Sequence, residues 1–592
     1  MDREILERAK QWTNEEFDEK TRTEVKRLIN INDEKTLTDM FYKELEFGTG
    51  GMRGIMGPGT NRMNIYTVGK ASQGLANYLL ENMEDAKGRG IAIAYDSRNN
   101  SKLFAKEAAT VFAANGIRVY IFPELRPTPL LSYTVMALKA AAGVVITASH
   151  NPKEYNGYKV YCSEGYQITP PEDSRIVDYV NRVELIRGVK RMEYDKAREK
   201  GLIKELGADI DDSYLSKVQD FANRIESGLF TSNDNDSEIK VVYTPLHGTG
   251  ITLVPKVLET LGGAKVIKEP KQSIPDGNFP TTPSPNPEET VALQIAIELA
   301  IKEKADMVIA TDPDCDRMGL AIPDENGEFV PVNGNQIGTM LSYIIAQSLK
   351  NSGEMPSNPT IVTTIVSTEL VEKIAKDFGI DVIYVLTGFK YIGEKMYQFE
   401  KDRDRSFIFG FEESYGYLAD TFVRDKDGVI GSILALILVK YAKIHYGSVL
   451  NFLEDIYKKY GMYMEYQRSF VLKGIEGSQR IKSIMEKLRE NPPSEIDGSR
   501  VLVIKDYLKQ ESVNIDKNEL KKIEGLPKSN VLQFYTEDNV KVSIRPSGTE
   551  PKIKFYFAVN CDFSGNMKEM KIQLDKKYKK ASEDMFKICG LL

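Results

Sequence analysis

The stretch Val144-Val145-Ile146-Thr147-Ala148-Ser149-His150-Asn151-Pro152 decides the fold prediction, because a short β-branched run ends in a polar turn. Residues 142–146 are apolar throughout and predict a buried parallel strand, which Asn151-Pro152 ends. In open α/β sheets ligands bind just past the carboxyl ends of strands, so Ser149 is a candidate carrier of a covalently held phosphoryl group. The alternative, that Ser149 only satisfies nearby backbone groups, stays open on this stretch alone.

Strand and helix patterns alternate around this stretch. Residues 90–95 predict a strand, residues 105–115 a helix and residues 117–122 a second strand. This alternation predicts an α/β fold built on βαβ units with a mostly parallel sheet. Residues 155–161 predict a strand that turns back and places Lys159 within reach of the serine loop. Lys159 is therefore a candidate general acid or base, although most lysines are solvated surface charges.

The chain before this unit carries charged helices and then a glycine-rich segment. Residues 3–46 show helical spacing with many charges, which predicts solvent-facing amphipathic helices. Residues 47–54 place four glycines around Arg53, so the backbone can approach a ligand closely while the guanidinium offers a fork of donors. The segment does not match the G-x-G-x-x-G dinucleotide motif, because Arg53 stands where the last glycine should be. A glycine-rich turn without function is the open alternative.

Acidic residues mark a second strand end. Residues 305–310 predict a buried strand that leads into Thr311-Asp312-Pro313-Asp314-Cys315-Asp316-Arg317. Three carboxylates at alternate positions repel one another unless a cation lies among them, and oxygen-only ligands favour Mg²⁺ over zinc. An EF-hand loop is excluded, because its sixth position requires glycine and its twelfth glutamate, whereas the chain has Arg317 and Pro323 there. An acidic turn without an ion is the remaining alternative.

A third strand end carries two glutamates. Strands predicted at 360–366 and 382–385 precede Thr387-Gly388-Phe389-Lys390, and residues 407–409 lead into Gly410-Phe411-Glu412-Glu413-Ser414-Tyr415-Gly416. Carboxylates in such a position can accept hydrogen bonds from neighbouring sugar hydroxyls, whereas elsewhere adjacent glutamates are usually solvated.

The last polar loop lies between two strands predicted at 540–544 and 553–557. It reads Arg545-Pro546-Ser547-Gly548-Thr549-Glu550-Pro551-Lys552. Its backbone N–H groups, hydroxyls and cations make a phosphate cradle, and a plain hairpin turn is the alternative.

The stretches between these loops predict helices and connections. Residues 174–204 are charged and helical and are expected to join the first domain to the second, and residues 450–489 are expected to be helical. Residues 270–287 hold six prolines and are expected to form an ordered loop inside a domain rather than a linker.

The composition excludes several classes of function. At 592 residues the chain predicts about three to five domains. The 79 basic and 86 acidic residues give a formal net charge of −7, which argues against a nucleic-acid-binding surface. Four widely spaced cysteines and three histidines match no zinc-site spacing and predict reduced thiols in a cytoplasmic protein. The charged N-terminus is unlike a signal peptide, and the longest apolar run, residues 433–439, is too short to span a membrane.

Taken together, four motifs resemble those of the α-D-phosphohexomutase family, in the family's order and across most of the chain. They are a phosphoserine loop at 147–152, a metal loop at 312–317, a sugar loop at 412–414 and a phosphate loop at 545–551. The resemblance implies three similar α/β domains with mixed, mostly parallel sheets and a smaller C-terminal α+β domain around a central cleft. We expect these domains at 1–205, 206–325, 326–465 and 466–592, with one loop from each.

The resemblance also implies an activity. Ser149 would donate its phosphoryl group to a sugar phosphate and take the other phosphate back, which interconverts glucose 1-phosphate and glucose 6-phosphate through glucose 1,6-bisphosphate. Mg²⁺ held by Asp312, Asp314, Asp316 and Ser149 would supply the charge neutralisation that this transfer needs. Arg53 would brace the transferring group, and Lys159, His150 and Lys390 are the proton-transfer candidates. The expected substrate-binding residues are Thr387, Gly388, Glu412, Ser414, Arg424, Arg545, Ser547, Gly548, Thr549 and Lys552.

Some residues depart from the family pattern, and they leave the sugar open. Residues 47–54 differ from the more usual Gly-Thr-Ser-Gly opening, and Phe411 and Tyr415 flank the glutamates. These features and the length resemble the larger branch of the family, which includes phosphoglucomutases. Glucose phosphate is therefore the expected substrate, with mannose phosphate or pentose phosphate as alternatives. A Mg²⁺-dependent phosphatase and a non-catalytic sugar-phosphate sensor are the rivals from other classes. We expect a cytoplasmic monomer or dimer with no nucleic-acid or membrane partner.

Overall fold

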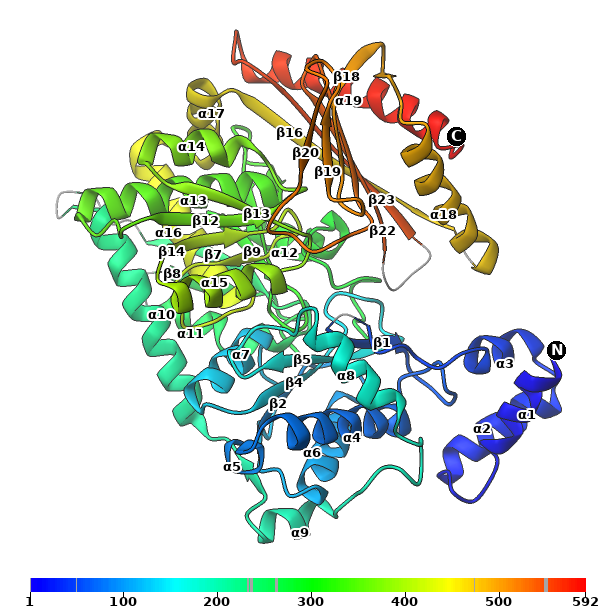
Figure 1. The fold of residues 1–592 in the computed structure, drawn as a ribbon. Helices are drawn as coiled ribbons and strands as arrows, with labels where there is room; N and C mark the ends of the chain where they lie inside the picture. Colours follow the sequence, from blue (N-terminus) through cyan, green and yellow to red (C-terminus); the bar gives the residue numbers. More distant parts are fainter. Residues whose placement is uncertain are drawn as a thin grey trace.

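A computed structural model describes residues 2–48, 50–231, 234, 238–260, 264–472, 474–547 and 552–592. Four sheets follow one another along the described chain, and the first three carry helices in the α/β manner (Figure 1). The fourth is an antiparallel sheet near the C-terminus. The predicted fold class is confirmed: three α/β units with mixed sheets precede a sheet-rich C-terminal unit.

The first sheet has the strand order β1-β5-β4-β2-β3-β6. Its strands are β1 (Gly51–Ile55), β2 (Ile91–Tyr95), β3 (Val119–Ile121), β4 (Ala142–Ile146), β5 (Tyr155–Cys162) and β6 (Ile203–Glu205). The inner strands β2 and β4 are parallel to each other and buried at every residue, as their continuous apolar runs predict. Strand β5 returns antiparallel to β4, so the loop between them carries Ser149 at the carboxyl end of the sheet.

The expected helical connection at 174–204 is only partly correct. It contains α8 (Glu172–Asn181) and α9 (Tyr194–Glu199), but its end lies in β6, which pairs in parallel with β3. This strand has three residues and only its first is buried, so the sequence shows no alternation that would mark it. Helix α10 (Ala208–Leu229) then runs along the side of the molecule towards the second and third units (Figure 1).

The second sheet has the order β11-β10-β9-β7-β8, and the third has the order β13-β12-β14-β15. Strands of the second are β7 (Ile239–Thr244), β8 (Ala264–Lys268), β9 (Met307–Thr311), β10 (Met318–Pro323) and β11 (Phe329–Val332). Strands of the third are β12 (Pro359–Thr364), β13 (Asp381–Val385), β14 (Ser406–Phe411) and β15 (Tyr417–Leu418). The proline-rich residues 270–287 lie between β8 and α12 (Thr290–Glu303), which places them inside the second unit, as expected.

Helix α16 (Gly428–Tyr446) extends the apolar run at 433–439 on both sides. Among the described helices it alone is long and apolar enough to cross a membrane. However, 78% of its apolar window is buried inside the protein, against strands of the second and third sheets. Burial on all sides explains why this helix is apolar around its circumference.

The C-terminal unit contains a strand where the sequence predicts helix. Between α17 (Val449–Tyr460) and α18 (Gly474–Glu490) lies β16 (Met462–Val471), so the expectation of helix across 450–489 is wrong in its middle. All ten residues of β16 pair antiparallel with β23 (Lys552–Cys561), which is about ninety residues later in the chain. This distant partner, rather than local propensity, decides the conformation.

The N-terminal helices α1 (Arg3–Gln11), α2 (Glu19–Asn30) and α3 (Glu34–Phe41) form a small separate core. Aspartates at 2, 18 and 33 cap their N-termini, and their charges face solvent, as the sequence predicts. Trp12, Phe17, Phe41 and Tyr66 pack together and fix this group to the first unit. Figure 1 shows the three helices at one side of the first unit, next to β1.

Candidate active site

The carboxyl ends of the central strands and the loops after them surround one cleft of about 1490 Å³. All four sheet units contribute to its walls. Ser149 comes from the first unit, Asp316 from the second, Glu412 from the third and Arg545 from the fourth. The four motifs that are far apart in the sequence therefore meet in one place.

Ser149 lies in the turn after β4 with its hydroxyl directed at the second unit. Its backbone has a φ of 53°, and its N–H donates to Thr147 Oγ1 at 2.8 Å. Its Oγ donates to Asp312 Oδ2 at 2.7 Å and lies 3.2 Å from His150 Nδ1. A left-handed backbone is uncommon for serine, so the surrounding contacts hold this residue in a strained conformation at the site.

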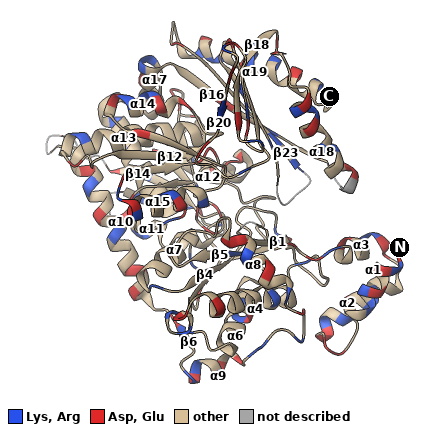
Figure 2. Cartoon of the chain, viewed as in Figure 1, with Lys and Arg blue, Asp and Glu red and all other residues tan. Residues whose placement is uncertain are grey.

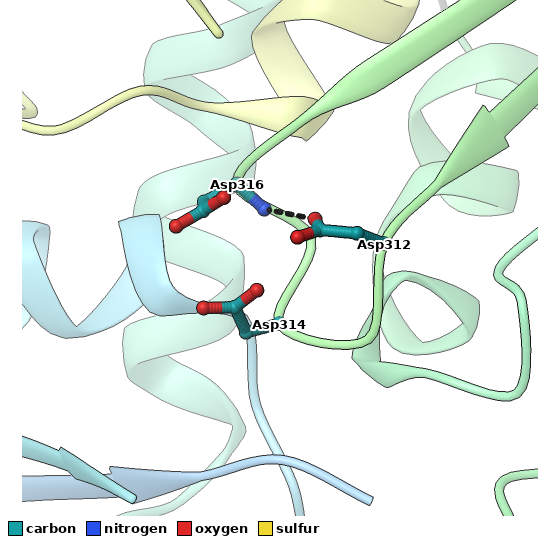
Figure 3. A group of neighbouring side chains, drawn as sticks. All are labelled: Asp312, Asp314 and Asp316. Carbon is teal, nitrogen blue, oxygen red and sulfur yellow. Dashed lines mark hydrogen bonds between the residues drawn. The ribbon is translucent and has the colours of Figure 1, made fainter. Parts of the chain in front are cut away.

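The three aspartates form one compact group after β9. Asp312, Asp314 and Asp316 are fully buried, and one carboxylate oxygen of each lies within 4.8 Å of the others. Figure 3 shows the carboxylates turned towards a common point, with the backbone N–H of Asp316 donating to Asp312. Oδ1 of Asp314 and Oδ1 of Asp316 are buried without a hydrogen-bond partner among the described residues. Buried orphaned carboxylate oxygens fit a hard divalent cation, so these residues suit a metal ion.

Two lysines oppose the charge of the aspartates. Lys159 Nζ lies 2.7 Å from Asp314 Oδ2 and 3.0 Å from Asp316 Oδ2, and Lys426 Nζ lies 2.9 Å from Asp316 Oδ2. Burial opposes the charge of Asp316, but Lys159 and Lys426 outweigh it and lower its pKa. Burial also raises the pKa of Asp312 well above its ordinary value, and the neighbouring carboxylates add to the rise.

Lys159 keeps its proton in this setting. Burial disfavours its charge, but the carboxylates of Asp314 and Asp316 raise its pKa above the ordinary lysine value. A lysine held charged at neutral pH can balance negative charge or donate a proton, but it cannot accept one.

Residues 51–54 of the glycine-rich segment lie in strand β1, which lines the cleft. Gly51 of β1, whose φ is 139°, pairs with Lys159 of β5. A Cβ at Gly51 would lie 1.9 Å from Tyr158 O, so only glycine lets the two strands approach. This pairing brings Arg53 into the cleft, where its Nη1 donates to Asn151 Oδ1 at 3.2 Å.

His150 and Lys390 also line the cleft, and both have lowered pKa values. Burial, followed by the charges of Arg317 and Arg53, holds the pKa of His150 well below its usual range. Lys390 is the first residue of α15 (Lys390–Asp402), and its Nζ lies 3.9 Å from Asp173 Oδ2. Burial lowers the pKa of Lys390. Neutral imidazole can accept a proton near neutral pH, and a lowered pKa makes the Lys390 ammonium a readier proton donor than an ordinary lysine.

The residues expected to bind sugar lie together in the third unit. Glu412 Oε1 accepts a hydrogen bond from the Gly388 N–H at 2.9 Å, and Ser414 lines the cleft beside it. Thr387 Oγ1 is buried without a partner among the described residues. Burial raises the pKa of Glu412 to about 7, and the neighbouring Glu413 adds to the rise.

Part of the expected phosphate cradle lines the cleft from the fourth unit. Arg545, Ser547 and Lys552 line the cleft, whereas Gly548 and Thr549 lie outside the described residues. Ser547 N donates to Lys552 O at 2.7 Å, which draws the two ends of the loop together. Figure 2 shows basic residues at the end of β23 that faces the first unit.

Among the described residues expected to bind substrate, Arg424 alone lies outside the cleft lining. The metal-site candidates Asp312 and Asp314 also lie outside it, whereas Asp316 lines the cleft. Its Nη1 donates to Glu164 O at 2.9 Å, and its Nη2 pairs with Glu400. Lys426, two residues further on, lines the cleft instead. The run Arg424-Asp425-Lys426-Asp427 before an apolar helix signals buried charges, but not which of them faces the ligand.

Sequence reasoning missed several other charged residues of the cleft. Arg317 lies beside the aspartates and pairs with Glu288 at 2.7 Å, and both line the cleft. Lys554 lines it next to Lys552. The alternation of Lys552 and Lys554 along β23 could have identified the second lysine, because residues two apart lie on one face of a strand.

Comparisons with known proteins agree with this arrangement. Family models described as phosphoglucomutase/phosphomannomutase, alpha/beta/alpha domains I, II and III, match residues 44–187, 213–327 and 333–460. A phosphoglucomutase of Staphylococcus aureus (strain bovine RF122 / ET3-1) is 38% identical over 530 residues, which cover 88% of this chain and 91% of the relative. One from Staphylococcus saprophyticus is 36% identical over 542 residues, which cover 91% and 94%.

Solved structures share the fold at low sequence identity. Parafusin, a phosphoglucomutase from Paramecium, superposes with a TM-score of 0.66 at 16% identity, covering 93% of this chain and 96% of its own. A putative phosphomannomutase from Thermus thermophilus has a TM-score of 0.63 at 19% identity, covering 91% and 99%. With the family models and the staphylococcal relatives, this confirms the recognition made from the four motifs: the chain belongs to the phosphoglucomutase/phosphomannomutase family, the α-D-phosphohexomutases.

Proposed function

We propose that this chain is an isomerase that interconverts glucose 1-phosphate and glucose 6-phosphate, the activity for which its staphylococcal relatives are named. One observation carries the proposal. A serine hydroxyl lies 2.7 Å from one of three clustered aspartates that could hold a cation, in a cleft that is also lined by a separate set of basic residues from the fourth unit. Transfer between the two ends of one sugar needs both features, because one phosphate must stay bound while the other moves.

The aspartates and Ser149 are the residues that would hold Mg²⁺. When bound, the ion supplies positive charge to a phosphoryl group that is being transferred. The orphaned oxygens of Asp314 and Asp316 support this assignment. A cytoplasmic location and a monomeric or dimeric state stay predictions, and so do the four domain boundaries.

The chain's own residues support the following cycle. The phosphoserine P–O bond at Ser149 breaks as a P–O bond forms to a sugar hydroxyl, whose proton leaves through a base of the cleft and ends on the freed Ser149 oxygen. Lys390, whose pKa burial lowers, is the candidate base when deprotonated. The resulting glucose 1,6-bisphosphate turns over in the cleft, and Ser149 Oγ then attacks its other phosphate. A P–O bond forms to Ser149 as the P–O bond to the sugar breaks, and the freed sugar oxygen takes up the proton that the serine gives up. His150, neutral and 3.2 Å from Ser149 Oγ, is placed to take the serine proton in this second transfer. Lys159 keeps its charge and stabilises the phosphoryl group throughout.

Glu412 predicts a pH dependence of substrate binding. Its pKa is raised to about 7, so below that pH the free protein holds a protonated carboxyl that accepts fewer hydrogen bonds. We expect KM for glucose 1-phosphate to rise as pH falls through 7, by about tenfold at one pH unit below. Glu412→Gln should raise KM and should remove the rise of KM as pH falls through 7. Because the substrate phosphate also titrates near pH 6, the ratio of wild-type to variant KM isolates Glu412, and a ratio constant with pH would contradict the assignment.

Arg545 predicts a binding defect rather than a chemical one. Arg545→Met removes a fork of donors from the passive phosphate, and a charged hydrogen bond contributes about 1.5–3 kcal/mol. We expect KM for glucose 1-phosphate to rise roughly 10- to 100-fold. Steady-state kinetics would test this, with Arg500→Met as the matched control, because Arg500 is exposed on the same sheet outside the cleft lining. Equal effects of both substitutions would refute the cradle.

The function itself is tested by offering glucose, mannose and ribose 1-phosphates in parallel and comparing kcat/KM, with phosphorus NMR following both isomers and free phosphate. The expected result is the highest kcat/KM with glucose 1-phosphate and negligible release of phosphate. Phosphate release that exceeds isomer formation would favour a phosphatase, and binding without turnover a sugar-phosphate sensor. A preference for mannose or ribose phosphate would replace the proposed sugar and keep the reaction class.

A further inference from the structure

A single buried guanidinium lies directly beneath the Ser149 turn. Arg98 follows β2, and its side chain is fully inaccessible to solvent. Its Nη2 donates to Ser149 O at 2.6 Å and also to Asn151 O, and its Nη1 donates to Pro152 O at 2.9 Å and Tyr155 O at 3.1 Å. One side chain therefore satisfies four carbonyl oxygens of the segment that leads from Ser149 into β5.

The segment turns, so these carbonyls are not paired in a regular ladder, although Pro152 O also accepts a hydrogen bond from the Tyr155 N–H at 3.0 Å. Ser149 has a φ of 53°, and Asn151-Pro152 follows immediately. A buried carbonyl left without a donor costs about 1–3 kcal/mol. Arginine presents five N–H groups in a planar fork, whereas lysine presents three on one atom and cannot reach oxygens on two sides.

The residues around Arg98 hold the turn from its other end. Asp96 accepts hydrogen bonds from Thr147 Oγ1 at 2.6 Å, from Ser101 Oγ at 2.7 Å and from the Arg98 N–H at 2.9 Å. Thr147 Oγ1 in turn accepts from the Ser149 N–H. The carboxylate of Asp96, 3.4 Å from Arg98 Nε, thus fixes the amide side of Ser149 while the guanidinium fixes its carbonyl side.

The proline-rich loop of the second unit covers the same guanidinium. The ring of Phe279 lies 5.0 Å from the Arg98 guanidinium carbon. Asn99 Nδ2 donates to Asn278 Oδ1 at 3.0 Å, and Ser284 Oγ donates to His150 O at 3.3 Å. A Cβ at Gly277 would lie 2.3 Å from Asn99 N, so the proline-rich loop packs closely against the backbone next to Arg98. Arg98 therefore stands where the unit that carries the serine meets the unit that carries the aspartates.

We infer that Arg98 is a positioning residue that holds Ser149 Oγ against the aspartate group, acting through the backbone of residues 149–155 and not by touching substrate. This inference rests on the proposed function. A serine displaced by about 1 Å from its phosphoryl partner loses on the order of 10²-fold in rate. The passive phosphate and the sugar are bound by the third and fourth units, so their affinity should not depend on Arg98.

Arg98→Lys tests this, with Arg89→Lys as the matched control. Arg89 lies in the same unit and donates to two backbone carbonyls, Lys139 O at 2.9 Å and Ala140 O at 3.2 Å, but is outside the cleft lining. In Arg98→Lys we expect kcat to fall about 100-fold, KM for glucose 1-phosphate to change less than threefold, and amide hydrogen exchange to accelerate in residues 149–155. We also expect slower transfer of phosphate from glucose 1,6-bisphosphate to Ser149, followed by intact mass. Arg89→Lys should match wild type in all four.

A purely structural role would lower the folded fraction and leave KM and kcat of the folded protein unchanged. An unaltered kcat per folded molecule in Arg98→Lys, or a KM that rises as much as kcat falls, would overturn the inference. If Arg98→Lys does not fold, Phe279→Leu replaces it as the test variant. This change removes the aromatic ring that packs on the Arg98 guanidinium and keeps the four hydrogen bonds of Arg98. Unchanged exchange in residues 149–155 together with unchanged kcat would then refute the role. Measuring wild type alongside separates the proposed isomerase activity from the proposed role of Arg98. Failure of wild type to isomerise would overturn the activity, whereas hydrogen exchange in residues 149–155 would still test the role of Arg98.

Discussion

Replacing Ser149 by alanine should abolish isomerisation and leave the protein folded. Ser149 Oγ lines the cleft and lies 2.7 Å from Asp312, whereas Thr128 Oγ1, which donates to Asp314 at 3.1 Å, lies outside the cleft lining. Removing a covalent nucleophile costs on the order of 10⁶-fold in kcat in well-studied enzymes, and we expect a loss of that size here. The structural cost is small, because the hydroxyl makes one hydrogen bond to Asp312 and one contact with His150, worth about 1 kcal/mol each.

The measurement is kcat at saturating glucose 1-phosphate, together with intact mass after incubation with glucose 1,6-bisphosphate. Wild type should gain one phosphoryl group, and Ser149→Ala none. Ser132→Ala is the matched control: Ser132 is also buried in the first unit, and its hydroxyl donates to Gly165 O at 2.6 Å, but it does not line the cleft. Normal turnover in Ser149→Ala would refute the mechanism, and an equal loss in Ser132→Ala would point to a folding defect.

The loops after β4 and β9 were predictable because their signal is local. Both strands are buried at every residue, so they appear in the sequence as continuous apolar runs, and polar residues follow them directly. Parallel strands present their carboxyl ends at one edge, which is why Ser149 and the aspartates could be expected to face ligand. The family resemblance then supplied what the local signal cannot, namely that loops from different units meet.

The missed residues depend on contacts between distant parts of the chain. Strand β16 is defined by its pairing with β23, and Gly51 by the close approach of Tyr158. Asp427 caps α16 and accepts a hydrogen bond from Tyr214 of α10 at 2.7 Å. These contacts fix the chain before α16, where Lys426 lines the cleft and Arg424 pairs with Glu400 instead. Arg98 gives no sign of its role in the sequence, since its four acceptors are backbone oxygens of a segment some fifty residues later.

Removing divalent cations should stop phosphoryl transfer, and the charges at the site say why. Three buried carboxylates face Lys159, Lys426 and Arg317, but Glu288 also pairs with Arg317 and Asp425 with Lys426, so the protein groups leave no spare positive charge. A phosphoryl group on Ser149 adds a charge of about −1.5 to −2, which these cations no longer balance. A divalent cation at the orphaned oxygens of Asp314 and Asp316 restores the balance. We expect chelation to lower kcat by roughly 10³-fold, which Mg²⁺ should restore.

The same charge argument predicts that the phosphoryl group and the metal ion strengthen each other's binding. Such coupling is reciprocal and typically amounts to about 5- to 150-fold in affinity. Calorimetric titration of Mg²⁺ should therefore give a Kd about 10- to 100-fold lower for phosphorylated than for dephosphorylated wild type. Asp314→Asn removes one ligand and one charge, so its activity should respond little to added Mg²⁺. Asp324→Asn, at a partly exposed residue of the same unit outside the cleft lining, should respond as wild type does. Equal Mg²⁺ affinity with and without the phosphoryl group would show that the ion, if bound, lies too far from Ser149 to neutralise it, and the assignment of the aspartates to the transfer step would fail.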